Sequence, residues 1–303
     1  MEKNLPMNAV IDLWIKYKQN TVKLSTWTYY RRVSNKILKI EWGKYMSFDI
    51  TNNAIENLSK NLSSTYSSKT VRDIIGIANQ ILIFSYEQGY LQCNYLKRVK
   101  IPLKKKSPEI LSLAEQKAFT SFLLNNPDSS KIGVLLSLYT GLRLGELCGL
   151  QWKDVDLKKR TLCINKTIQR IEDENGTTFL LIDSPKTISS ERVIPIPNFL
   201  IPLLYGIKTK NESDYVSTGK PTFTQPRTYQ SRLKSYLKKC ELPDYHFHTL
   251  RHTFASRAIE LGFDPKSLSE ILGHSSVKIT LDLYVHPSME AKKEQMDLFK
   301  NLI

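Results

Sequence analysis

The sequence is poor in the residues and patterns that mark several common classes of protein. Its four cysteines lie far apart and include no Cys-x-x-Cys pair, which argues against a disulfide framework and against a zinc cluster. No window holds about 18 uncharged apolar residues, and the first residues lack the apolar core of a signal peptide. We therefore expect a soluble, cytoplasmic protein with reduced cysteines and no membrane association.

Patterns of nucleotide-dependent and metal-dependent enzymes are missing as well. There is no Gly-x-x-x-x-Gly-Lys-Ser/Thr loop for a nucleotide phosphate. The closely spaced His246, His248 and His252 suggest a metal site, but no acidic residue lies between Tyr245 and Glu260, and the His-Glu-x-x-His pattern is absent. We expect neither a cofactor nor a bound metal.

Basic residues, in contrast, are abundant. The formal net charge is +15 at pH 7, which indicates an acidic polymer such as nucleic acid as the partner. Residues 1–106 carry 18 Lys and Arg against 7 Asp and Glu, so the first third of the chain is its most basic part. The stretch KRVKIPLKKK at 97–106 breaks the helical pattern, and we interpret 97–108 as an interdomain linker, either merely solvated or in contact with DNA. The candidate DNA-binding residues there are Lys97, Arg98, Lys100, Lys104, Lys105 and Lys106.

The apolar pattern predicts two domains, mainly α-helical with a small antiparallel β-sheet. Residues 1–96 show the 3.6-residue period of about four helices, with one apolar stripe at Val10–Ile15 and a longer one at Val71–Leu82. Residues 109–303 open with a capping box at Ser112–Glu115. A hairpin is expected around Asn175-Gly176, with strands in RTLCINKTIQRI, TTFLLID and RVIPIP, and helices follow to a C-terminal tail helix.

Four strings in this second domain carry the residues of a phosphate-handling site. They are YTGLRLGELCGLQW at 139–152, SPKTISSERVIPI at 184–196, HFHTLRHTFAS at 246–256 and LGHSSVKITLDLYVH at 272–286. All five histidines of the chain lie at or after position 246. Such a concentration of histidine and arginine indicates a common function.

In this order, the strings resemble the tyrosine recombinase family of phage and conjugative-transposon integrases. The resemblance implies a helical core-binding domain, a catalytic domain, and site-specific recombination of double-stranded DNA through a 3′-phosphotyrosine, by protomers that assemble as a tetramer. It implies the following catalytic residues: Arg143, Lys186, His248, Arg251, His274 and the nucleophile Tyr284. Supporting roles are expected for Glu146, His252 and His286.

The same residue types suit the chemistry on physical grounds. Two arginines match the extra negative charge of a phosphodiester transition state and can do so without a metal ion. The phenol of Tyr284 must lose a proton, for which His248 is a candidate acceptor, whereas Lys186 is suited to protonate the leaving 5′ oxygen. His274 would donate a hydrogen bond to the phosphate.

Helical spacing predicts how three of these residues are held. His248 and Arg251 lie three residues apart and so share a helical face, free of the apolar stripe of Leu250, Phe254, Ala258 and Leu261. Gly141 indicates a break that places Arg143 at the start of a new helix, with Glu146 on the same face to hold it.

Several alternatives remain open from the sequence. Tyr284 has the spacing of an ordinary core residue, and Lys186 that of a solvated turn residue. The chemistry would equally serve a type IB topoisomerase-like enzyme, and the basic first domain would serve a non-catalytic DNA-binding regulator. The tail helix could dock on a neighbouring protomer or pack on its own domain. The DNA target, any accessory DNA-bending protein and any further N-terminal arm-binding domain are not specified by the sequence.

Overall fold

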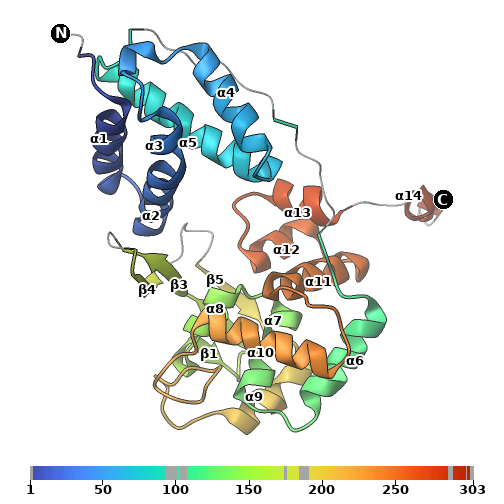
Figure 1. The fold of residues 1–303 in the computed structure, drawn as a ribbon. Coiled ribbons are helices and arrows are strands. Elements are labelled where there is room, and N and C mark those ends of the chain that lie inside the picture. The colour runs from blue at the N-terminus through green and yellow to red at the C-terminus, as the bar shows by residue number, and fades with distance from the viewer. Residues whose placement is uncertain are drawn as a thin grey trace. The chain divides into compact units, whose positions relative to one another are not determined.

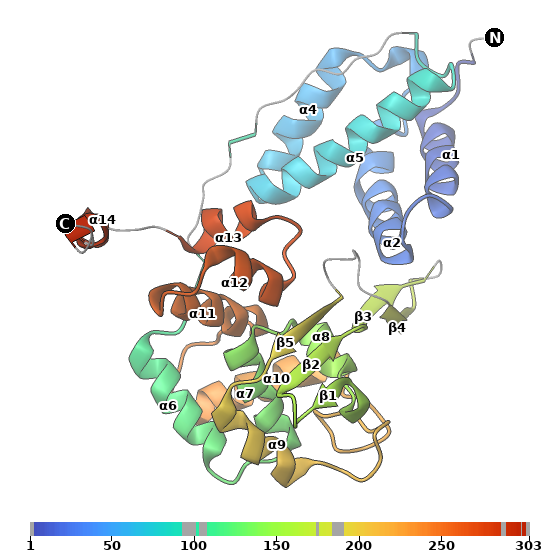
Figure 2. The same ribbon diagram turned by 180° about the vertical axis from the view of Figure 1, so that it is seen from behind.

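The computed structural model describes residues 3–92, 101–102, 108–173, 176–183, 191–285, 289–297 and 299–300 (Figures 1 and 2). Lys186, His286 and the six basic residues predicted to bind DNA lie outside these ranges. The chain divides into two compact units, Met1–Lys106 with Ile171–Phe179, and Ser107–Arg170 with Leu180–Ile303. The predicted domain limits at 96 and 109 remain predictions.

The described part of Met1–Lys106 in the first unit is mainly helical, as the apolar period predicts. Helix α1 spans Met7–Gln19, and α2 (Leu24–Val33) continues through the π-helical turn η1 (Ser34–Leu38) into α3 (Lys39–Trp42). A 3₁₀ turn η2 (Ser47–Asp49) leads to α4 (Asn52–Ser63) and the long α5 (Ser68–Glu87). Both predicted apolar stripes, Val10–Ile15 on α1 and Val71–Leu82 on α5, supply buried residues to one core.

The second unit contains most of the helices. Their bounds are α6 Leu113–Leu124, α7 Ser129–Thr140, α8 Leu144–Gly149, η3 Trp152–Asp154, η5 Asn198–Leu200, α9 Ile201–Ile207, α10 Pro226–Lys239, α11 Phe247–Glu260, α12 Pro265–Leu272, α13 Val277–Tyr284 and α14 Met289–Asp297. The predicted capping box is present: Ser112 Oγ accepts the backbone N–H of Glu115, and Glu115 Oε2 accepts that of Ser112.

The strands form two small sheets rather than the single sheet expected. Antiparallel strands β1 (Val155–Asp156), β2 (Thr161–Ile164) and β5 (Arg192–Pro195) lie in the order β1-β2-β5, while β3 (Thr167–Glu172) pairs with β4 (Thr178–Asp183). The string RTLCINKTIQRI, predicted as one strand, thus forms the two strands β2 and β3. The strand is interrupted at Asn165 and Lys166 because both side chains bind the carboxylate of Asp154, at 2.9 and 2.8 Å.

Two left-handed glycines shape the backbone around the predicted site. Gly141 ends α7 with φ +70°, and Gly273 ends α12 with φ +63°, a conformation that favours glycine. A Cβ on Gly141 would lie 2.7 Å from Phe254 Cδ1, so a larger residue is also excluded by packing. The predicted break at Gly141 is therefore confirmed, and the chain turns there directly into α8.

Helices α11, α12 and α13 pack together through a small core that includes Ala255, Leu268, Leu272 and Tyr284. Tyr284 is the last residue of α13, and only 8% of it is exposed. None of the helices in the described ranges combines the length and apolar character needed to cross a bilayer.

Candidate active site

Arg143 stands immediately before the first residue of α8, as the break at Gly141 predicts. Its backbone N–H donates to Glu146 Oε2 at 2.9 Å, and its Nη1 donates to Glu146 Oε1 at 2.7 Å. Nη2 donates to the carbonyl oxygen of Gly273 at 3.1 Å. About a third of the side chain (35%) is exposed, so the guanidinium is fixed by these hydrogen bonds and still accessible to solvent or a ligand.

Arg251 lies on α11, one helical turn after His248. The side chain does not stand free at a cleft as predicted, because only 2% of the residue is exposed. Its Nη1 donates to the carbonyl of Gly141 at 2.8 Å and its Nη2 to that of Leu272 at 2.6 Å. The predicted apolar stripe beside it is wrong at its end, since Leu261 is 78% exposed.

The pKa of Arg251 is lowered to about 9, first by burial and then by the positive charge of Arg143. This value lies well above neutral pH, so the guanidinium keeps its charge. The described hydrogen-bond partners of this buried cation are neutral carbonyls, and the charge of Glu146 offsets only part of the cost of burying it beside Arg143. The site is therefore electrostatically prepared for an anion.

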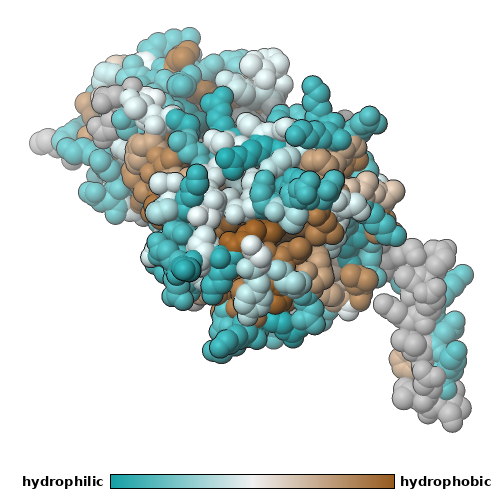
Figure 3. Space-filling view, turned by 90° about the horizontal axis from the view of Figure 1, so that it is seen from below, coloured by the Kyte–Doolittle hydropathy of each residue, from teal (hydrophilic) through white to brown (hydrophobic). Residues whose placement is uncertain are grey.

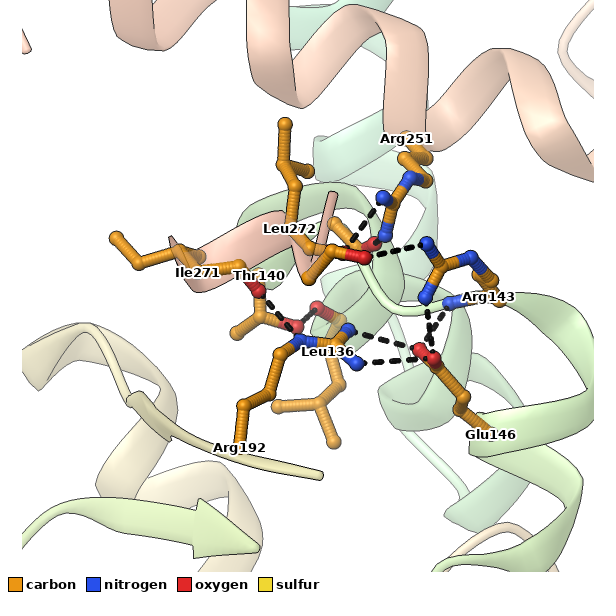
Figure 4. Close-up of polar contacts among 10 residues, drawn as sticks. Leu136, Thr140, Arg143, Glu146, Arg192, Arg251, Ile271 and Leu272 are labelled. Atoms are coloured by element: carbon orange, nitrogen blue, oxygen red, sulfur yellow. Dashed lines mark hydrogen bonds and ion pairs between the residues drawn. The ribbon is translucent and has the colours of Figure 1, made fainter. Parts of the chain in front are cut away.

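Glu146 is the carboxylate that balances part of this charge. It is 5% exposed, and both of its oxygens accept hydrogen bonds from Arg192, at 2.9 Å each (Figure 4). Burial alone would raise the pKa of Glu146, but the hydrogen bonds and charge of Arg192, with the charge of Arg143, outweigh burial and lower it. Glu146 thus stays ionised and holds Arg143, as expected from the sequence.

Sequence reasoning missed Arg192. It opens β5, where exposure alternates along the strand, so Arg192 and Ile194 are both buried. That alternation in RVIPI was the available signal, because a charged residue on the buried face of a strand needs a partner.

Three histidines lie beside the arginines. His248 is the most exposed of them, yet partial burial and the charges of His252, Arg251 and Arg143 lower its pKa to about 4. His274 follows the end of α12, its Nδ1 lies 2.9 Å from Thr280 Oγ1, and burial with the nearby arginines lowers its pKa to about 4. Both imidazoles are therefore neutral at pH 7 and can donate or accept a hydrogen bond.

Tyr284 meets His252 directly. Its phenolic oxygen lies 2.6 Å from His252 Nδ1, and the ring of His252 stands edge-on to that of His248 at 4.6 Å between centroids. Burial raises the pKa of Tyr284, while the charges of Arg251 and Arg143 act in the opposite direction. Burial and Arg251 lower the pKa of His252, which keeps its imidazole neutral.

The described residues thus bring together Arg143, Glu146, His248, Arg251, His252, His274 and Tyr284 within the second unit. Lys186 and His286 lie outside the described ranges, so their roles remain predictions. Among the residues that the structure describes, no three His, Cys, Asp or Glu side chains are grouped to hold a metal ion.

Known proteins resemble the chain in both sequence and fold. It is 27% identical to the ICEBs1 integrase of Bacillus subtilis, over 90% of this chain and 75% of that one. It is likewise 27% identical to the integrase of Staphylococcus phage L54a, over 99% and 94%. The solved structure of the Tn1549 transposon integrase in complex with a circular intermediate DNA has a TM-score of 0.80 at 21% identity, over 97% and 99%.

The Phage integrase family matches residues 109–291, and the chain belongs to this family. It is a tyrosine-type site-specific DNA recombinase. These matches do not favour the topoisomerase-like enzyme or the non-catalytic regulator.

Proposed function

We propose that the chain cuts and rejoins double-stranded DNA at the recombination sites of a mobile element, through a 3′-phosphotyrosine bond to Tyr284. The observation that carries this proposal is the placement of a buried tyrosine hydroxyl within the fields of Arg251 and Arg143, beside a neutral histidine. These groups come from three separate helical segments. Their convergence supports a site for attack on a phosphodiester.

In the proposed cleavage, the hydroxyl of Tyr284 gives its proton to His252 and its oxygen attacks the phosphorus of the scissile phosphate, while the bond from phosphorus to the 5′ oxygen breaks. Arg143 and Arg251 bind the non-bridging oxygens, and His274 donates a further hydrogen bond to them. The 5′ oxygen takes a proton from Lys186 and leaves as a hydroxyl. Attack by a 5′ hydroxyl on the phosphotyrosine reverses these steps and reseals the strand, so no nucleotide is consumed.

Recombination is separated from simple nicking and resealing by supplying two duplexes. The DNA that flanks the gene is placed on two labelled duplexes, and the products are separated on a gel. Exchange of labelled arms supports a recombinase. Relaxation of a supercoiled plasmid that lacks the site, without arm exchange, would instead support the topoisomerase-like alternative. Cleavage should continue in excess chelator, which distinguishes this chemistry from that of a metal-dependent nuclease.

His252 is the better-placed acceptor for the proton of Tyr284, although the sequence favoured His248. We expect His252→Gln to slow formation of the covalent adduct by about 10²- to 10⁴-fold. An acceptor must be neutral, so wild-type cleavage should fall as the pH falls through the lowered pKa of His252. That acid limb should be absent in His252→Gln and kept in His248→Gln. The reverse result would return the role to His248. Adduct formation on a nicked suicide duplex, followed from pH 4 to 8, decides between them.

Lys186 is tested by changing the leaving group. We expect Lys186→Ala to cleave an ordinary duplex about 10²- to 10⁴-fold more slowly, because the 5′ oxygen then leaves without a proton donor. A duplex with sulfur in place of the bridging 5′ oxygen should restore the rate, since a thiolate leaves without protonation. If the sulfur substrate gives no rescue, Lys186 is not the general acid.

The assembly that we propose is a tetramer on two DNA sites, in the cytoplasm. A tetramer bound to a Holliday junction is known for lambda integrase, whose solved structure has a TM-score of 0.69 at 15% identity, over 95% of this chain and 80% of that one. Exposed apolar residues such as Phe199 and Tyr205 and the apolar surface in Figure 3 suit contact between protomers. The tail helix, with Met289 and Met296 exposed, is a second contact candidate. The basic residues at 97–106 would bind DNA phosphates, and accessory DNA-bending proteins could assist.

A further inference from the structure

Arg192 is enclosed within the active-site unit and saturated with local contacts. Only 8% of the residue is exposed. Its Nη1 and Nη2 donate to the two oxygens of Glu146 at 2.9 Å each, and its Nε donates to the carbonyl of Ile271 at 2.7 Å (Figure 4). Unlike Arg251, whose terminal nitrogens donate to neutral carbonyls, Arg192 has its charge paired with a carboxylate and its three nitrogens engaged, so it is poorly placed to bind DNA itself.

We propose that Arg192 is a positioning residue of the cleavage reaction, which acts through Glu146 and through the end of α12 to hold Arg143 and His274 at the scissile phosphate. The inference rests on the proposed function and adds a residue to it. Two sets of hydrogen bonds connect Arg192 to the phosphate-binding groups, one through Glu146 and one through the end of α12.

The first route runs through Glu146. This carboxylate binds both the guanidinium and the backbone N–H of Arg143, so its place sets that of Arg143. The charged and titratable groups that face it are Arg192 from β5, Arg143 at the start of α8, and Arg251 and His248 from α11. Without Arg192, Glu146 would lose its hydrogen bonds to that guanidinium, and the charge that it keeps above its raised pKa would act on Arg143 and draw it away from the phosphate.

The second route runs through the end of α12. The carbonyls of Ile271 and Leu272 accept hydrogen bonds from Arg192 and Arg251 (Figure 4), and the carbonyl of Gly273 accepts one from Arg143. Gly273 also packs on Arg192 so closely that a Cβ would lie 2.9 Å from Arg192 Cδ. His274 comes next in the chain, so the direction in which it leaves α12 depends on this arginine contact.

The experiment compares Arg192→Gln and Arg192→Lys with wild type on a nicked suicide duplex. We expect the cleavage rate of Arg192→Gln to fall about 10- to 100-fold, the usual loss when a residue that orients a catalytic group is removed. The dissociation constant for DNA should stay within about threefold of the wild-type value. Arg192→Lys keeps the charge but loses the two-pronged contact, so its loss should be smaller. Arg257→Gln on α11, which removes an ion pair with the exposed Glu260 outside the site, should cleave like wild type.

A pH profile separates positioning from a general structural role. Arg192 keeps the buried Glu146 ionised, so its removal should raise the pKa of Glu146 and add a second acid limb to the cleavage rate, set by Glu146 and separate from the limb set by His252. A carbon-13 titration of the Glu146 carboxyl should show the same shift without DNA. Because Glu146→Gln removes the carboxylate, adding Arg192→Gln to it should cost much less than the two single losses combined.

The outcomes are distinct. A folded Arg192 variant that cleaves within threefold of wild type, loses DNA affinity and rate in equal measure, or leaves the Glu146 titration unmoved overturns the inference. Failure of both variants to show a cooperative thermal transition also overturns it, since Arg192 would then serve the fold alone. If wild type itself forms no covalent adduct on any cognate site, the proposed function fails, and the Glu146 titration still decides whether Arg192 controls that carboxylate.

Discussion

Tyr284→Phe is expected to form no covalent complex with DNA, with a loss of at least about 10⁴-fold, because no other group can supply the attacking oxygen. The substitution removes one hydroxyl and its hydrogen bond to His252, which costs about 1 kcal/mol of stability and should leave the fold intact. The measurement uses a nicked suicide duplex and a denaturing gel, on which a covalent adduct migrates more slowly than free protein.

A second buried tyrosine of the same unit provides the matched control. Tyr245 is 7% exposed, and its hydroxyl donates to Glu115 Oε1 at 3.0 Å. Tyr245→Phe should form the adduct at the wild-type rate, and both variants should bind the duplex with wild-type affinity. An adduct that persists in Tyr284→Phe would remove the nucleophile assignment, whereas loss of DNA binding in that variant would show that the hydroxyl serves assembly of the site.

Local patterns predicted the parts of this fold that depend on local physics. The capping box at Ser112, the break at Gly141 and the buried stripes of α1 and α5 each follow from neighbouring residues. The strand RTLCINKTIQRI did not, because the break at Asn165 depends on Asp154, a partner that enters through tertiary contact. Propensity alone favoured a continuous strand there.

The sequence named several residues that the structure places close together, but it did not show how they are arranged. Spacing placed His248 and Arg251 on one helical face, but it could not show that Arg251 is buried against the carbonyls of Gly141 and Leu272. Nor could it show that Tyr284 meets His252, 32 residues away, rather than His248. Arg192 escaped notice for the same reason, since its partner Glu146 lies 46 residues earlier. Such pairings are set by packing between elements.

Arg251→Lys should lower the cleavage rate by about 10³-fold or more, the scale expected for loss of an arginine that stabilises phosphoryl-transfer charge. Lysine has one donor group, which cannot hold the carbonyls of Gly141 and Leu272 and also face a phosphate from a fixed plane. Burial also lowers the pKa of a lysine and weakens its charge at this position. Arg251→Ala should cleave no faster than Arg251→Lys. It should also be less stable, since two buried carbonyls lose their donor, which costs about 1 to 3 kcal/mol of unfolding free energy for each.

The effect of these substitutions on folding stability must be separated from their effect on the cleavage step. Arg257→Lys, six residues further along α11, changes a partly buried arginine that binds Glu260 and the carbonyl of Leu111, and it should cleave at the wild-type rate. Cleavage rates are compared at a temperature where thermal unfolding shows every variant to be folded, with DNA affinity measured alongside. An Arg251→Lys protein that binds DNA normally and cleaves within tenfold of wild type would show that Arg143 alone carries the phosphate charge, because Arg251 would then serve only to join the ends of α7 and α12.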